Sequence, residues 1–161
     1  MRPLTSSEFG LVREFTRLAI HVPDGEQWDL DDLVDNVPQI RLYWEGFGTK
    51  PTDVAWCAEQ GDTVIGIASA RVLDGDPAGY GNVGPGVPEV DVSIFPEQRG
   101  RGIGTTLLTA LLQDLAQRGH DRVSLSVDRT NDKARRVYER LGFVVVLDDP
   151  ARTDLLLACN L

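Results

Sequence analysis

Residues 99–104 read Arg-Gly-Arg-Gly-Ile-Gly, and this glycine-rich turn directly precedes a run with helical apolar spacing. Glycine permits positive φ and carries no side chain, so several main-chain N–H groups can point at one place. The following helix adds unpaired N–H groups and a positive dipole end, which favour an anion. Arg99 and Arg101 add full positive charges. The turn therefore predicts a site for a phosphate-bearing ligand, best of all a diphosphate.

The spacing of the glycines excludes two familiar phosphate-binding loops. A Walker loop requires G-x-x-x-x-G-K-S/T, a string that the chain lacks. The dinucleotide fingerprint requires G-x-G-x-x-G, but its third glycine falls on Thr105 when counted from Gly100 and on Leu107 when counted from Gly102. The alternative is a tight turn that binds nothing, although three glycines and two arginines exceed what a turn requires.

Two segments in order resemble a known family. Arg99, Gly102 and Gly104 fill the pattern Gln/Arg-x-x-Gly-x-Gly/Ala between a predicted strand and a long predicted helix. Downstream, residues 131–143 match Asn-x-x-Ala-x-x-x-Tyr-x-x-x-Gly-Phe at every marked position. The two patterns at this separation resemble the GNAT superfamily of N-acetyltransferases, and the resemblance covers residues 89–147.

The resemblance implies an α+β, three-layer fold in a single domain over residues 1–161. A central mixed, mostly antiparallel sheet would be flanked by helices, with strands 4 and 5 splayed apart to admit the pantetheine arm of acetyl-CoA. Residues 1–88 would form the acceptor part and residues 89–147 the part that binds acetyl-CoA. The implied activity is transfer of an acetyl group from acetyl-CoA to a primary amine.

The family pattern also implies which residues bind the coenzyme. The main chain of Ile94 and the side chain of Asn131 would contact the pantetheine arm, amides from 98 to 104 would hold the diphosphate, and Tyr138 would lie near the sulfur. The full expected set is Ser93, Ile94, Phe95, Gln98, Arg99, Gly100, Arg101, Gly102, Ile103, Gly104, Thr105, Asn131, Arg135 and Tyr138.

Acetyl transfer to an amine requires a base, because an alkyl amine is almost wholly protonated near neutral pH. Glu89 and Asp91 alternate with apolar residues in a predicted strand, and neighbouring carboxylates repel, which raises one pKa toward a working value. We expect Glu89 ahead of Asp91 as the base, because family members often carry Glu there. Tyr138 is the expected acid for the leaving thiolate. The alternatives are a solvated strand face for the carboxylates and a core position for Tyr138.

An aromatic and acidic segment in the first half indicates the acceptor. Carboxylates and aromatic faces suit an organic cation. We therefore expect Trp44, Glu45 and Phe47 to bind a small, positively charged amine such as an amino sugar or a polyamine. A protein or peptide amine, N-terminal or lysine, is the other candidate acceptor, and a helix core is the alternative role for Trp44 and Phe47. A non-catalytic acyl-CoA-binding regulatory domain is the alternative from a different functional class.

Composition narrows the remaining possibilities. The chain has 161 residues, a net charge of −9 and 42% hydrophobic residues, which is ordinary for one soluble domain and disfavours general binding to nucleic acid. Neither a membrane span nor a secretory signal is expected from the distribution of apolar residues. Two cysteines and two histidines predict neither a disulfide scaffold nor a metal site. We expect a reduced, cytoplasmic protein, and the resemblance adds the expectation of a homodimer.

Apolar periodicity and turn residues predict the elements that position these groups. In the first half we expect a helix over 5–20 capped by Ser6 or Ser7, a helix that Pro38 breaks in two, a hairpin over 54–68 and a loop over 74–88. The second half predicts, in order, a strand, a helix from Ile103 to Gly119, a strand, a helix capped by Asn131, and two strands at 143–147 and 154–158.

Overall fold

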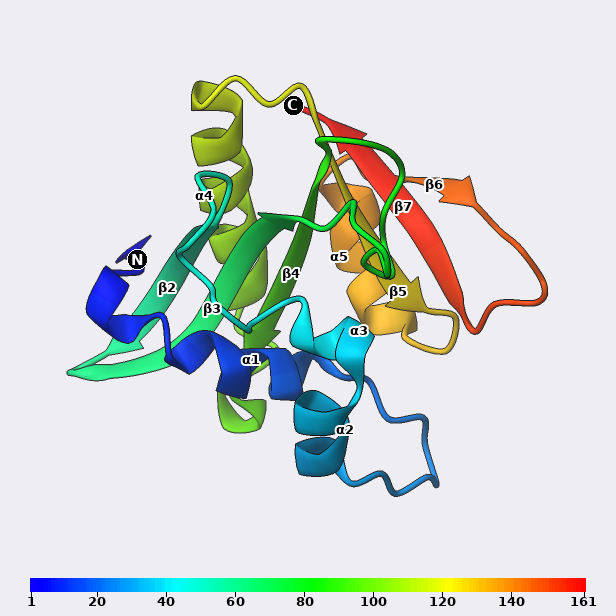
Figure 1. Ribbon diagram of the computed structural model, residues 1–161. Coiled ribbons are helices and arrows are strands. Elements are labelled where there is room, and N and C mark those ends of the chain that lie inside the picture. Colours follow the sequence, from blue (N-terminus) through cyan, green and yellow to red (C-terminus); the bar gives the residue numbers. More distant parts are fainter.

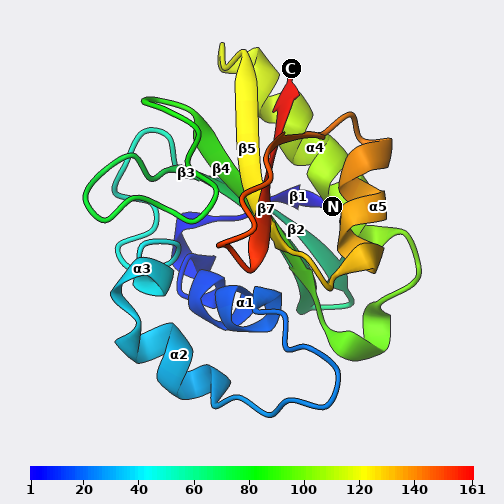
Figure 2. The ribbon, with the colours of Figure 1, turned by 90° about the vertical axis from the view of Figure 1, so that its right-hand side faces the viewer.

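The computed structural model describes residues 1–161, which form a seven-stranded sheet with helices on both sides (Figures 1 and 2). The sheet order is β1-β2-β3-β4-β5-β7-β6. Its strands are β1 (Arg2–Pro3), β2 (Val54–Gln60), β3 (Thr63–Val72), β4 (Pro88–Ile94), β5 (Arg122–Asp128), β6 (Val144–Leu147) and β7 (Asp154–Asn160). The helices are α1 (Leu11–Ala19), α2 (Leu30–Asn36), α3 (Pro38–Arg41), α4 (Ile103–Gln117) and α5 (Asp132–Arg140). The predicted mixed sheet and α+β fold are confirmed.

β4 and β5 are the one parallel pair, and they barely touch. A single register pair, Glu89 with Ser124, joins them, whereas β3 pairs with β4 and β5 pairs with β7 at seven positions each. Beyond that pair the two strands diverge and form a V that opens downward in Figure 1. The predicted splaying of the fourth and fifth strands is therefore confirmed, and it leaves main-chain groups of both strands without a neighbouring strand.

Two apolar layers fix the sheet. Four leucines of α4, at positions 107, 108, 111 and 115, are completely buried against one face, as the predicted apolar stripe requires. On the other face Val12 and Phe15 of α1 pack with Phe47 in a second cluster. A fully buried leucine stabilises the fold by roughly 1.5–3 kcal/mol, so α4 is held rigidly and its N-terminal turn is positioned with it.

The first helix is shorter than predicted, and Gly10 stands at its N-cap. A 3-10 turn covers Ser6–Glu8, and α1 begins at Leu11. The predicted cap at Ser6 or Ser7 is wrong: Thr5 precedes the turn, and its N–H donates to the Glu8 carboxylate at 2.9 Å. The predicted break at Pro38 is confirmed, because Pro38 ends α2 and starts α3.

The polar residues of β4 do not form a solvent-facing row. Glu89 is 3% exposed and Ser93 is 7% exposed. The reason is that α1 and the segment after α3 cover this face of the strand: Ser93 Oγ donates to the Phe15 carbonyl of α1 at 2.6 Å. The carboxylates of β4 therefore lie inside the molecule. None of the helices combines the length and the apolar composition needed to cross a bilayer.

Candidate active site

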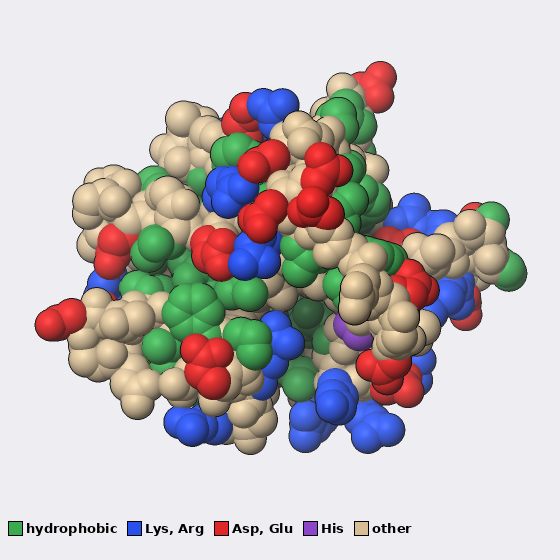
Figure 3. Space-filling view, turned by 90° about the horizontal axis from the view of Figure 1, so that it is seen from below, with side chains coloured by type: hydrophobic (Ala, Val, Ile, Leu, Met, Phe, Trp, Pro, Cys, Tyr) green, Lys and Arg blue, Asp and Glu red, His purple; other side chains and the backbone are tan.

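A cavity of about 390 Å³ lies where β4 and β5 diverge. β4 contributes Glu89 and Asp91 to its wall, and β5 contributes Ser126 and Asp128. Residues of α1, α2, α3, α5 and the start of β7 complete it. Seen from below, the surface is hollowed beside a histidine, and basic side chains gather along the lower edge of the view (Figure 3). The gap in the sheet is therefore a pocket with both main-chain and carboxylate groups in its wall.

The glycine-rich turn at the start of α4 is open. Gly100 and Gly102 have φ values of +77° and +78°, and a Cβ atom at either position would meet nothing within 4 Å. Gly102 is the left-handed N-cap, and the first helical bond runs from Thr106 N–H to Gly102 C=O at 3.1 Å. The N–H groups of residues 103–105 consequently have no partner in the helix. A turn with bare donors and unfilled space fits a diphosphate.

Arg99 braces the turn instead of extending into solvent. Its Nε donates to the Ile94 carbonyl at 3.1 Å and its Nη2 donates to the Leu18 carbonyl at 3.4 Å. The Ile94 carbonyl therefore already accepts one hydrogen bond from within the protein. Arg101 donates to Gln98 Oε1 at 3.0 Å in an exposed position.

The register of β4 decides which of its main-chain groups face the gap. Phe95 N–H donates to the Ile65 carbonyl at 3.0 Å, so Phe95 and Ser93 turn their main-chain groups toward β3. Val92 and Ile94, between them, turn theirs toward β5. The side chains of these two predicted coenzyme residues pack against α1: Ser93 Oγ bonds to it, and the centroids of the Phe95 and Phe15 rings lie 5.2 Å apart. The Ile94 N–H remains available in the gap.

Asp91 lies in the cavity with one oxygen committed. Ser69 Oγ donates to its Oδ1 at 2.5 Å, and Oδ2 has no protein partner. Burial raises the pKa of Asp91 to about 6, although the Ser69 hydrogen bond lowers it. An acid with that pKa is mostly ionised at neutral pH and is still basic enough to accept a proton.

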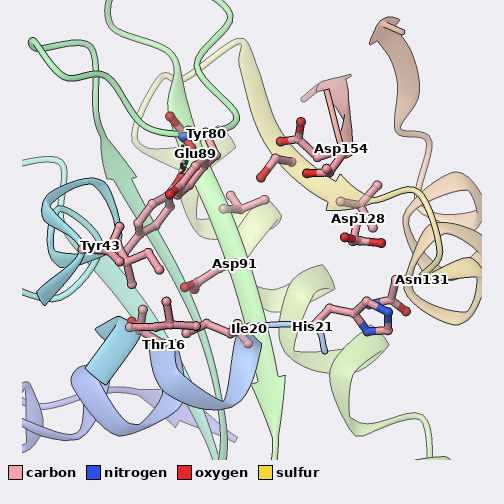
Figure 4. Close-up of a pocket in the computed structure, with 18 of the residues that line it drawn as sticks. Thr16, Ile20, His21, Tyr43, Tyr80, Glu89, Asp91, Asp128, Asn131 and Asp154 are labelled. Atoms are coloured by element: carbon pink, nitrogen blue, oxygen red, sulfur yellow. Dashed lines mark hydrogen bonds between the residues drawn. The ribbon is translucent and has the colours of Figure 1, made fainter. Parts of the chain in front are cut away.

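Glu89 is enclosed more tightly than Asp91. Its Oε2 accepts hydrogen bonds from the Tyr43 hydroxyl at 2.6 Å and from Gly81 N–H at 2.9 Å. Burial raises the pKa of Glu89, while these two hydrogen bonds lower it. Figure 4 shows Glu89 pointing at Tyr43 and Asp91 lying further along the same strand.

Tyr138 and Asn131 lie on the α5 side of the cavity. The Tyr138 ring is buried edge-on against Phe143, with the centroids 5.8 Å apart, and its hydroxyl has no protein partner. Burial, together with the charge of Asp91, raises the pKa of Tyr138, so the phenol keeps its proton at neutral pH. Asn131 Oδ1 caps α5 by accepting from Ala134 N–H at 3.2 Å, as predicted. Arg135 pairs with Glu139 at 3.2 Å outside the cavity.

The sequence profile of the acetyltransferase (GNAT) family matches residues 17–143. The chain belongs to the GNAT family. The predicted family is thereby confirmed, and the match includes the glycine turn, both carboxylates of β4 and Tyr138.

Two curated relatives of this GNAT chain have the same name. Mycothiol acetyltransferase of Corynebacterium aurimucosum is 48% identical over 130 residues, which is 76% of this chain and 38% of that protein. The protein of the same name from Nocardioides sp. is 42% identical over 132 residues, 80% of this chain and 43% of its own length. The GNAT chain thus spans less than half the length of these relatives.

Solved structures share the fold of the GNAT chain at low identity. The GNAT acetyltransferase from Streptococcus pneumoniae has a TM-score of 0.68 at 15% identity, covering 99% of this chain and 97% of that one. The PaiA N-acetyltransferase from Thermoplasma acidophilum, in complex with coenzyme A, has a TM-score of 0.67 at 16% identity, with coverages of 99% and 97%.

Three predicted acceptor residues of the GNAT chain lie outside the cavity. Phe47 is 8% exposed and packs edge-on against Phe9 at 5.4 Å. Trp44 Nε1 donates to the Val34 carbonyl at 3.0 Å, and the Glu45 carboxylate pairs with Arg41. These side chains support the fold, which corrects their expected role.

Tyr43, Tyr80 and Trp28 supply the aromatic lining instead. Leu33, Val37, Ile40 and Tyr43 all line the cavity and follow one another at spacings of three or four residues. Trp44 also follows Ile40 by four residues, so this helical spacing marks the segment but does not favour Tyr43 over its neighbour Trp44. Tyr80 lies in a glycine-rich loop without any periodicity, so no such signal marks it.

Proposed function

We propose that this chain transfers an acetyl group from acetyl-CoA to the primary amine of a small cationic molecule. The observation that carries the proposal is the cavity in the gap between β4 and β5, whose wall holds a carboxylate and a phenol. Membership of the GNAT family supports the reaction class. Because the chain covers under half of its curated relatives, the acceptor is argued from the cavity itself.

The residues around the gap fit coenzyme A. The turn at Gly100 and Gly102 offers open space and the bare N–H groups of residues 103–105 for a diphosphate. In this proposal the Ile94 N–H and the Asn131 side chain bind an amide-containing arm that lies between the strands. When bound, acetyl-CoA supplies an acetyl group activated as a thioester. The chain's own residues hold acetyl-CoA in place, accept a proton from the amine and donate one to the sulfur.

Asp91 is the base in this proposal. Its free Oδ2 accepts a proton from the amine, directly or through one water molecule, so that the nitrogen can attack. The Ile94 N–H provides a main-chain donor where negative charge develops on oxygen. The Tyr138 hydroxyl, on the α5 side of the cavity, holds its proton and donates it to the departing sulfur.

Charge and aromatic groups in the wall support a cationic acceptor. The cavity is lined by four carboxylates, Glu89, Asp91, Asp128 and Asp154, and by no Lys or Arg side chain. Arg152 neutralises Asp154 from outside at 2.7 Å. The remaining acids, with the aromatic faces of Tyr43 and Tyr80, favour a positively charged guest.

Two measurements test the proposed function together. Calorimetric titration with acetyl-CoA is expected to show saturable binding, and a thiol-release assay is expected to show turnover with spermidine or glucosamine. A peptide with a free amino terminus is the comparison acceptor. Exclusive turnover of the peptide contradicts the small cationic acceptor. Binding of acetyl-CoA without turnover of any amine contradicts the enzymatic function.

Tyr138→Phe is expected to lower kcat by about 10²-fold, because the substitution removes only the hydroxyl that supplies the proton. The free energy of unfolding is expected to stay within about 0.5 kcal/mol of the wild type, since the hydroxyl has no protein partner. Steady-state thiol release and thermal denaturation measure the two effects. An unchanged kcat removes Tyr138 from the mechanism.

A further inference from the structure

Glu89 is the most enclosed carboxylate of the cavity, and glycines form its roof. Its Oε1 is buried without a hydrogen-bond partner. A Cβ atom added to Gly79 would lie 2.1 Å from that oxygen, so the loop main chain packs directly on the carboxylate. Gly81 is equally tight, because its Cβ would lie 2.6 Å from the Leu125 carbonyl carbon. The main chain of the loop therefore covers Oε1 of Glu89.

The second oxygen of Glu89 joins β4 to two other segments of the chain. Oε2 accepts from Tyr43, which follows α3, and from Gly81 N–H in the loop between β3 and β4. The Tyr43 hydroxyl in turn accepts from Tyr80 N–H at 2.8 Å. The Tyr43 and Tyr80 rings stack in parallel with centroids 6.4 Å apart (Figure 4). One hydroxyl and one carboxylate therefore fasten the loop to the sheet.

Two further contacts fix the same loop from outside. Gln39 Nε2 donates to the Ala78 carbonyl at 2.6 Å, and Arg152 Nη2 donates to the Tyr80 carbonyl at 2.8 Å. Residues 78–81 are thus held by α3, by β4 and by the segment just before β7. Tyr43, Tyr80 and Glu89 all face the cavity, and together we call them the tyrosine wall.

We propose that Glu89 is a positioning residue that acts through Tyr43: it holds residues 78–81 in place, so that the tyrosine wall sets which acceptor amines fit. The inference rests on the proposed acetyltransferase function and deepens it. It separates the two carboxylates of β4, because Asp91 has a free oxygen in the cavity, whereas both oxygens of Glu89 are covered by the loop.

Amide hydrogen exchange tests the positioning role without any turnover. Tyr43→Phe removes the oxygen that accepts from Tyr80 N–H and one of the two donors to Glu89. We expect exchange at the amides of Tyr80 and Gly81 to become about tenfold faster. Tyr80→Phe is the matched control for exchange, because it keeps the ring and both main-chain donors. Unchanged exchange at these amides in Tyr43→Phe overturns the inference.

Steady-state kinetics tests whether the tyrosine wall selects the acceptor. The substrate is an amine that the thiol-release assay identifies as an acceptor. Tyr43→Phe is expected to raise KM for that amine about tenfold, while kcat and KM for acetyl-CoA stay within about twofold. Glu89→Gln is expected to leave most of the tyrosine wall in place, because the amide oxygen still accepts hydrogen bonds from Tyr43 and Gly81. The fall of kcat at acidic pH should also persist in this variant. If Glu89→Gln abolishes that fall, Glu89 is the base and the inference fails. If the wild type acetylates no amine but Tyr43→Phe still shows the expected faster exchange at Tyr80 and Gly81, the result counts against the proposed function alone.

Discussion

Gly102→Val is expected to weaken acetyl-CoA binding by at least about 100-fold while leaving the protein folded. Gly102 has a φ of +78°, a region that a β-branched residue rarely adopts, and its position now faces open space. Valine would both shift the turn and fill the space in front of the N–H groups of residues 103–105. Because those donors act together at the helix N-terminus, a small displacement weakens every one of them. Calorimetric titration measures the loss.

Gly119→Val is the matched control for this substitution. Gly119 lies at the opposite end of α4 with a φ of +86°, and a Cβ atom there also meets nothing within 4 Å. It therefore carries the same backbone strain, which costs about 1–2 kcal/mol, without touching the turn. We expect reduced thermal stability and wild-type binding for Gly119→Val. Equal loss of binding in both variants would attribute the effect to strain and contradict the role of the turn.

Asp91→Asn is expected to lower kcat by about 10³-fold, because asparagine keeps the shape and the hydrogen bond from Ser69 but accepts no proton. The pH dependence follows from the same group. Burial raises the pKa of Asp91 to about 6, so in the wild type kcat should fall about tenfold per pH unit below that value. In Asp91→Asn the residual rate should lose this acidic limb. A limb that persists in the variant places the base elsewhere.

The same substitution is expected to stabilise the fold at neutral pH. A carboxyl whose pKa rises from 3.8 to about 6 on folding favours the native state below pH 4 and loses that contribution as the pH rises through 6. Above that range the buried charge opposes folding by on the order of 2–3 kcal/mol, which asparagine removes. Thermal denaturation at pH 7 should therefore show a higher Tm for Asp91→Asn. A lower Tm would mean that Asp91→Asn loses activity because the fold is damaged.

The conformation of the glycine-rich turn and of α4 could be predicted from sequence because both are local. The turn from Arg99 to Gly104 and the helix after it are adjacent in the chain, and glycine spacing together with the leucine stripe of α4 determines both. The cap at Asn131 follows from the same short-range logic. The bracing of Ile94 by Arg99 could not be predicted, since it depends on how the turn folds back on the strand.

The acceptor side depends on contacts between distant segments. Tyr43 meets Glu89 across 46 residues, and neither residue type nor spacing marks that pairing. Glu89 and Asp91 are equivalent in the alternating pattern of β4. Only the loop that contains Gly79 and Gly81, which packs on Glu89, distinguishes them. Aromatic content favours Trp44 as much as Tyr43, because it does not give the direction of each side chain on its helical turn.

The most direct test of the coenzyme site is an NMR titration of the ¹⁵N-labelled protein with coenzyme A, followed at individual amides. We predict saturable shifts at Ile103, Gly104 and Thr105, where the helix leaves N–H groups without partners, and at Ile94 in the gap between the strands. Pantetheine, which lacks the diphosphate, should shift the amide resonance of Ile94 and leave the resonances of the three turn amides unchanged. Saturation by coenzyme A with no movement at residues 103–105 would contradict the account.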